Sequence, residues 1–260
     1  MIESPSARAS GSPEASGAAP PAPGSLIHDV LRAHGGVERW KRVARIDCTL
    51  RCGGLAFELR GKSTGLLRRR VSVYPHRRLT VFHDLPGPGQ HARWEGDSVC
   101  LDRGPSRPAL LREEARAHFF EPSARRRWDD LDLTYFAGYA AWNYLSFPFL
   151  LAEPGVRVTS HRLLGQDWLP ADFPAALTTH SSRQHFRIDS DGTLLRHDYT
   201  AEVFGAWAHA ANLCLDSRWI SGLRLYTRRR VVPSLGRLAR LPGPVLVWLE
   251  LDDLSVLDRD

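Results

Sequence analysis

The residues that could carry acid–base chemistry gather in one predicted strand, where His197, Asp198 and Tyr199 are consecutive. Neighbouring residues of a strand point to opposite faces, so His197 and Tyr199 share a face and Asp198 points away from it. This alternation excludes a His–Asp dyad within the strand. It leaves His197 and Tyr199 as a possible acid/base pair. The plainer interpretation is a pair of satisfied polar groups inside the fold.

Three histidines around the same hairpin, His180, His185 and His197, carry the ring nitrogens that zinc prefers. They could share a metal only if His185 and His197 occupied facing positions, which the sequence does not fix. The four cysteines form no Cys-x-x-Cys pair. Cys48 and Cys52 lie four residues apart on one strand, so a disulfide between them is implausible. We expect reduced thiols, no metal and no cofactor.

Glycine and arginine motifs identify no reaction or nucleic-acid partner. The Gly-Gly pairs lack the Lys-Ser or Lys-Thr of a phosphate-binding loop, and no Gly-x-Ser-x-Gly elbow occurs. Arginine triplets at 68–70, 125–127 and 228–230 contribute to a net charge of +6. The first and third lie in strand-like segments, where alternation divides them between two faces. We expect no nucleic acid, whereas an anionic membrane surface is a possible partner.

The stretch that must position these residues is 133–152, which contains no charged side chain and seven aromatic ones. Three aspartates just before it suit the N-terminus of a helix. Pro148 disfavours helical geometry at the preceding residue, so the helix is predicted to end near Ser146. The run meets a crude criterion for a membrane span, but its Tyr, Asn and Ser side chains favour a buried helix.

This helix could equally be a plain core helix or one wall of a ligand cavity, because Tyr and Trp serve in both. The sequence does not favour the core helix over the cavity wall, or the reverse. If it is a wall, the candidate ligand-binding residues are Phe136, Tyr139, Trp142 and Phe147, followed by Phe204 and Trp207.

Two groups of alternating segments flank the aromatic stretch. The first is expected at 44–51, 55–60, 66–74, 79–82, 91–94 and 98–101, and the second at 156–163, 183–200, 218–220, 223–232 and 245–251. The segment 109–120 is interpreted as a helix and 168–174 as a loop. The pattern predicts a mainly β, α+β fold. It consists of a single curved antiparallel sheet, or unclosed β-barrel, of ten or eleven strands covered by helices.

Residues 1–24 are rich in Pro, Ala, Ser and Gly, so they are predicted to be a disordered tail. They lack the pattern of a secretory signal and contain no Cys for a lipid anchor, which leads us to expect a cytoplasmic protein. The remainder, 25–260, is expected to be one domain with a helical insertion at about 105–152.

Two segments resemble the lipoprotein-carrier, or LolA-like, superfamily. They are LIHDVLRAHGGVERWKRVARID at 26–47 and QHFRIDSDGTLLRHDY at 184–199. The chain also looks close to bacterial members of that superfamily for which no function is known. The resemblance implies an unclosed β-barrel with an apolar concave face, covered by helices and able to hold acyl chains or other lipids.

Three functional hypotheses follow. The first is a non-enzymatic protein that binds an apolar or lipid-like ligand between the curved sheet and the aromatic helix. The second is a cofactor-free cyclase, isomerase or hydrolase that uses the same cavity, with His197 and Tyr199 as acid/base groups. The third is a structural or partner-binding protein with a filled core. The oligomeric state is left open.

Overall fold

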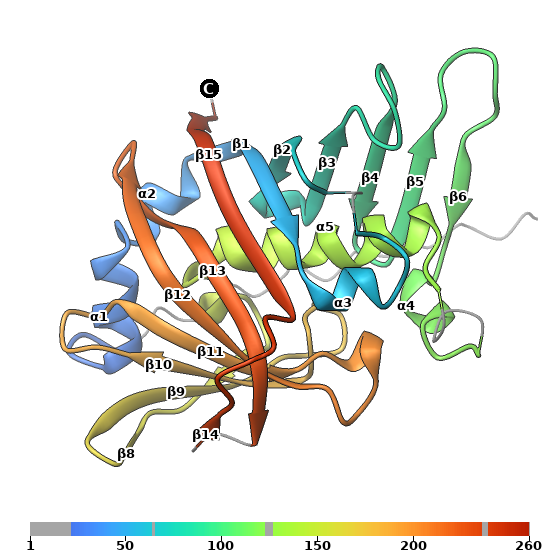
Figure 1. Ribbon diagram of the computed structural model, residues 1–260. Coiled ribbons are helices and arrows are strands. Elements are labelled where there is room, and N and C mark those ends of the chain that lie inside the picture. The colour runs from blue at the N-terminus through green and yellow to red at the C-terminus, as the bar shows by residue number, and fades with distance from the viewer. Residues whose placement is uncertain (1–21, 64–65, 123–126, 236–238, 260) are drawn as a thin grey trace, which may run out of the picture.

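Fifteen strands form one antiparallel sheet in a computed structural model that describes residues 22–63, 66–122, 127–235 and 239–259. The strand order is β6-β5-β4-β3-β2-β1-β15-β13-β12-β11-β10-β9-β7, with β14 beside β13 and β8 beside β9. The predicted class is confirmed, because the sheet curves without closing into a barrel (Figure 1). The predicted number of strands was too small. Most of the predicted tail, residues 1–21, lies outside the described residues.

The first half of the sheet follows two short helices. Ser25 caps the first of them, its hydroxyl accepting a hydrogen bond from the backbone N–H of His28. These elements are α1 (Leu26–Ala33), α2 (Val37–Lys41), β1 (Val43–Gly53), α3 (Leu55–Glu58), β2 (Arg69–Tyr74), η1 (Pro75–Arg77), β3 (Leu79–His83), β4 (His91–Glu95), β5 (Ser98–Asp102), β6 (Leu110–Arg112) and α4 (Ala115–His118).

The second half follows helix α5 (Asp130–Ser146) and returns to the centre of the sheet, where β15 pairs with β1. Its elements are η2 (Phe149–Ala152), β7 (Arg157–Val158), β8 (His161–Leu163), β9 (Gln166–Asp172), β10 (Arg183–Ile188), β11 (Leu194–Thr200), η3 (Glu202–Phe204), β12 (His209–Ile220), β13 (Leu223–Leu235), β14 (Ala239–Arg240) and β15 (Val247–Asp258).

Three local predictions were wrong. The segment predicted as a strand at 55–60 begins with α3, since both edges of β1 are already paired with β2 and β15. The segment predicted as a helix at 109–120 starts as the edge strand β6, and left-handed backbone at Glu114 (φ 48°) separates it from α4. The predicted loop at 168–174 includes most of β9, whose four consecutive buried residues hide the alternation of a strand.

Helix α5 begins and ends where the sequence predicts. The Asp129 carboxylate accepts a hydrogen bond from the backbone N–H of Asp132 (2.8 Å), and the Asp132 carboxylate accepts one from the N–H of Asp129 (3.0 Å). This reciprocal cap satisfies two N–H groups that the helix itself cannot use. At the other end Phe147 is extended before Pro148, so the helix stops.

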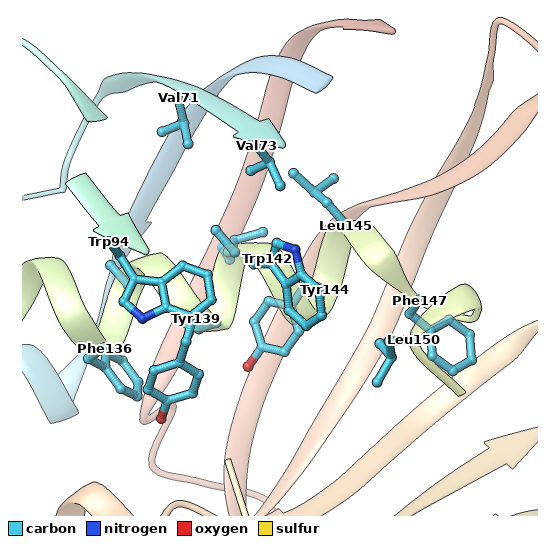
Figure 2. Close-up of a cluster of buried hydrophobic side chains, with 14 of the residues drawn as sticks. Val71, Val73, Trp94, Phe136, Tyr139, Trp142, Tyr144, Leu145, Phe147 and Leu150 are labelled. Carbon is cyan, nitrogen blue, oxygen red and sulfur yellow. The ribbon is translucent and has the colours of Figure 1, made fainter. Parts of the chain in front are cut away.

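The sheet wraps around α5, which lies along its concave side against β3, β4 and β5 (Figure 1). Every residue from Leu131 to Ser146 is buried, so the helix has no solvent-facing side. Leu145 extends toward Val73, whereas Tyr139 and Tyr144 extend from the opposite side of the helix (Figure 2). A helix that is buried all round belongs in the interior of a fold, which explains why it carries no charge after Asp132. None of the helices in the described parts of the chain is long and apolar enough to span a membrane.

Gly138 allows α5 to approach strand β4 closely. A Cβ at this position would lie 2.3 Å from the Cβ of Trp94 and 2.8 Å from its Cγ. Trp94 is fully buried, and the Gly138 carbonyl accepts a hydrogen bond from the hydroxyl of Thr80 (3.0 Å). The glycine is therefore needed for packing, although glycine weakens a helix.

We predict that Gly138→Ala lowers the free energy of unfolding by about 2 kcal/mol, because an added methyl group overpacks the interface with Trp94. In an unconstrained helix the same change stabilises by about 1 kcal/mol, so the sign of the effect is diagnostic. Urea denaturation monitored by circular dichroism measures it. Gly87→Ala, where no atom lies closer than 3.8 Å, is the control and should change little. A stabilised Gly138→Ala protein would contradict the close approach.

Candidate functional site

A hollow of about 540 Å³ opens to solvent near the N-terminal half of α5. We call it the aromatic hollow. Phe119 is buried at its base, whereas Phe120 and Trp207 are 54% and 76% exposed. Its lining consists of Arg60, Phe119, Phe120, Glu202, Phe204, Gly205, Ala206 and Trp207. Large aromatic side chains beside an open hollow are unusual on a protein surface, because their exposure to water is unfavourable.

Three segments that are far apart in sequence supply this lining. Arg60 follows α3, Phe119 and Phe120 follow α4, and the remaining residues connect β11 to β12. In that connection Gly205 has φ of +131°, and a Cβ there would lie 2.6 Å from Nε1 of Trp207. The glycine thus allows the loop to hold the Trp207 ring over its own backbone.

The aromatic hollow is continuous with the rings of α5. The ring centroid of Phe204 lies 4.9 Å from that of Trp128 and 5.3 Å from that of Phe136. The guanidinium of Arg60 stacks over the Phe204 ring, 5.2 Å from its centroid. The Arg60 Nε has no hydrogen-bond partner, and burial lowers the pKa of its guanidinium. An apolar molecule in the hollow would therefore touch aromatic rings and one cation.

A second hollow of about 400 Å³ adjoins the first, and Glu202 lines both. The carboxylate of Glu202 accepts a hydrogen bond from Nη2 of Arg116 (2.7 Å). Arg116 also donates to the backbone carbonyl of Thr179 (3.0 Å). This ion pair holds α4, η3 and the segment before β10 together at the boundary between the two hollows.

The structure separates the six predicted ligand-binding residues into two groups. Phe204 and Trp207 line the aromatic hollow, and Phe136 lies directly behind Phe204. Tyr139 packs against Phe136 at 5.7 Å between ring centroids.

The other two residues lie farther along the helix. Trp142 donates a hydrogen bond from Nε1 to the carbonyl of Pro75 (2.8 Å), and Phe147 stacks on Phe186 at 5.2 Å. Both are buried in packed surroundings (Figure 2). Whether any of the six residues contacts a ligand stays a prediction.

The predicted acid/base residues lie in the interior. His197 and Tyr199 share the inner face of β11, with ring centroids 4.7 Å apart. The His197 Nε2 pairs with Oε1 of Gln184, and the Tyr199 hydroxyl pairs with that of Tyr144 (2.9 Å). His180 stacks flat on Tyr199, 3.9 Å between centroids.

Burial raises the pKa of Tyr199 and lowers the pKa values of His197 and His180. All three side chains are therefore neutral at pH 7. The gap that His197 lines is narrower than a water molecule. The pairing of His197 and Tyr199 fits the interpretation of satisfied polar groups, whereas Nε2 of His180 has no hydrogen-bond partner.

The three histidines considered for zinc do not meet. His180 and His197 lie 6.1 Å apart between ring centroids, but His185 is in register with Asp198 and faces the other side of the sheet. In the described parts of the chain, His118, Asp129 and Asp132 form the one group of His, Cys, Asp or Glu side chains close enough to share an ion.

Arg112 already forms ion pairs with the two aspartates of that group. Its guanidinium pairs with Asp129 at 2.6 Å and with Asp132 at 2.7 Å, so the two carboxylates share one positive charge. The four cysteines are free thiols, as predicted.

Sequence reasoning missed Arg60, Phe119 and Phe120 in the aromatic hollow. Arg60 was assigned to a strand and the Phe119–Phe120 pair to a long helix, so nothing indicated that they converge. Their one available signal was two adjacent Phe residues next to an arginine-rich segment. Arg125 and Arg126 of that segment lie outside the described residues.

The buried histidines give a testable pH dependence. Burial lowers the pKa of His34 to about 4 and also lowers those of His180 and His197, while the unfolded chain takes up protons near pH 6.5. Stability is therefore lost as pH falls below about 6.5. Three carboxyl groups act in the opposite sense, since burial raises the pKa values of Asp132, Glu153 and Asp198. They are outnumbered by five histidines, because burial lowers the pKa values of His76 and His83 as well.

We predict that the melting temperature falls between pH 6.5 and 5, and that His180→Gln makes this fall shallower. Each proton taken up on unfolding contributes a slope of about 1.4 kcal/mol per pH unit. Differential scanning fluorimetry across the pH range measures the effect. Equal slopes for the two proteins would show that His180 is not held neutral.

No family model matches the sequence, and no curated protein matches it. In fold the chain is similar to several solved structures. A LolA superfamily protein from Nitrosomonas europaea matches with a TM-score of 0.49 and 8% identity, over 90% of this chain and 93% of that one. A DUF1329 family protein from Desulfovibrio piger matches at 0.40 and 13% identity, over 89% and 91%. The lipoprotein LppX of Mycobacterium tuberculosis matches at 0.26 and 12% identity, over 88% and 94%.

Proposed function

We propose that this chain binds an apolar, lipid-like small molecule in the aromatic hollow, against the rings that adjoin α5. The observation that carries this proposal is the exposure of Phe120 and Trp207 to solvent. Both rings lie beside a hollow that Phe119 and Phe204 also line. An apolar ligand would remove both exposed rings from water, and each square ångström of apolar surface buried stabilises the complex by about 25 cal/mol.

The size and chemistry of the hollow support the proposal. Its volume of about 540 Å³ is in the range of small-molecule sites, about 300 to 1,000 Å³. Its walls combine aromatic rings with a few polar groups, here Arg60 and Glu202. Apolar walls supply affinity in such sites, and the polar groups set orientation.

The rings of α5 would form the deeper part of this site. Phe136 is the next ring behind Phe204, and Tyr139 follows it. Trp142 and Phe147 are packed farther along the helix, so a ligand would reach them only if side chains between the sheet and α5 moved apart. In this proposal the aromatic residues of the hollow bind the ligand first. The part of the ligand that extends beyond the hollow then contacts the buried aromatic residues of α5.

We predict that Trp207→Ala weakens binding of the neutral fluorescent probe N-phenyl-1-naphthylamine about tenfold. Loss of one aromatic contact of about 1.4 kcal/mol corresponds to that factor. Fluorescence titration measures the dissociation constant, and circular dichroism confirms that the fold is intact.

Trp219→Ala is the matched control, because Trp219 is also exposed (55%) but lies on β12, outside the aromatic hollow. Its affinity for the probe should equal that of the unmodified protein. Equal affinity in all three proteins, or an absence of binding, would overturn the proposed function.

A further inference from the structure

Arg229 is a buried cation without an anionic partner. Its side chain is 1% exposed on the inner face of β13. Among the described residues, no carboxylate oxygen lies within 4.0 Å of its guanidinium nitrogens. The other almost fully buried arginine, Arg196, differs in this respect, since two of its nitrogens bind the Asp198 carboxylate at 2.6 and 2.7 Å.

The groups that touch Arg229 are neutral. Its Nη1 lies 3.0 Å from Sγ of Cys214, and its Nη2 donates to the carbonyl of Tyr144 (3.4 Å). The guanidinium stacks on the rings of Tyr144 (4.5 Å) and Tyr226 (5.2 Å). Burial raises the pKa of the Cys214 thiol, and it raises that of Tyr144 to about 12, so neither supplies a negative charge at pH 7. Cation–π contacts offset only part of the cost of removing this charge from water.

Other buried polar atoms near Arg229 also lack partners. The Arg229 Nε has none, and neither have Oδ1 of Asn143 and both side-chain polar atoms of Asn212. Asn212 is in register with His197, on the strand that pairs with β13. Buried polar groups are nearly always hydrogen-bonded, so several unpaired atoms beside an uncompensated charge indicate a missing polar group.

A narrow gap lies between Arg229 and α5. Tyr144, Phe147 and Leu150 line one side of it, and Phe186, Leu194 and His197 the other. Asn143, Gln184 and Arg229 complete the lining. The gap therefore combines apolar walls with a cation and two amide side chains, which is the chemistry that holds an acid group at the end of an apolar chain.

We propose that Arg229 binds the carboxylate of an acidic amphiphile, such as a fatty acid, whose apolar chain lies between α5 and strands β10 and β11. This inference rests on the proposed function and specifies the class of ligand. Because the gap is narrower than a water molecule, Phe147 and Leu150 must move apart from Phe186 and Leu194 when the ligand enters. The carboxylate supplies the missing negative charge, and the chain replaces the separated apolar contacts.

The test compares decanoate with decan-1-ol, which have the same chain length but differ in charge. Isothermal titration calorimetry gives both dissociation constants for the unmodified protein and for Arg229→Met, which conserves side-chain length. We expect the unmodified protein to bind decanoate more tightly than decan-1-ol. Arg229→Met should weaken decanoate binding tenfold or more and leave decan-1-ol binding unchanged, since a hydrogen bond to a charged group accounts for about that factor. Arg229→Lys keeps the charge and should keep part of the preference.

Two control variants show where the acid group binds. Arg60→Met removes the cation of the aromatic hollow and should leave the preference for decanoate intact. If Arg60→Met removes the preference and Arg229→Met does not, the inference is overturned, although the proposed function stands. Arg196→Met leaves Asp198 as an unpaired buried charge, so its melting temperature should fall well below that of ligand-free Arg229→Met.

The remaining outcomes are also decisive. If Arg229→Met is destabilised as much as Arg196→Met, the charge of Arg229 is already compensated and the inference fails. Binding of both probes without preference for the acid overturns the inference but not the proposed function. Binding of neither probe overturns both.

Discussion

A curved sheet that does not close must have its concave side covered, and burial of helix α5 meets that requirement here. The helix is surrounded on all sides, so the segment that forms it carries no charge after Asp132. Its position in turn depends on Gly138, which brings it against Trp94, and on the Asp129–Asp132 cap at its N-terminus. The shape of the interior on both sides of the helix follows from these contacts.

Filling the interior with Tyr, Trp and Asn, where aliphatic residues would suffice, has a cost in hydrogen bonding. Hydroxyl, amide and imidazole groups enter a region without water, and some of them pair with one another, as Tyr144 does with Tyr199. The pairing is incomplete at several places, among them Arg229 and Asn212. Unsatisfied groups of this kind destabilise a fold and persist where function requires them. Stability and ligand binding are thus expected to oppose each other at this end of the interior.

The parts of the structure that depend on local pattern could be predicted from the sequence. The helix from Asp130 to Ser146 follows from three aspartates and Pro148, and the hairpin of β10 and β11 from alternation around an Asp-Gly turn. The parts that depend on distant pairing could not. Leu55–Glu58 looks like a strand, but β1 has no free edge to accept it. The aromatic hollow joins three separate segments, and in the last arginine triplet alternation alone could not tell which arginine faces inward.

The pairing of β1 with β15 also affects how the chain folds. Val43 is in register with Asp258, so the centre of the sheet joins residues separated by most of the sequence. During synthesis the strands from β1 to β6 are made long before β15, so the middle of the sheet stays incomplete until β15 pairs with β1. Contacts between such distant residues slow folding and leave strand edges exposed in the meantime. A nascent chain of this protein is therefore expected to need protection from aggregation until β15 has been translated.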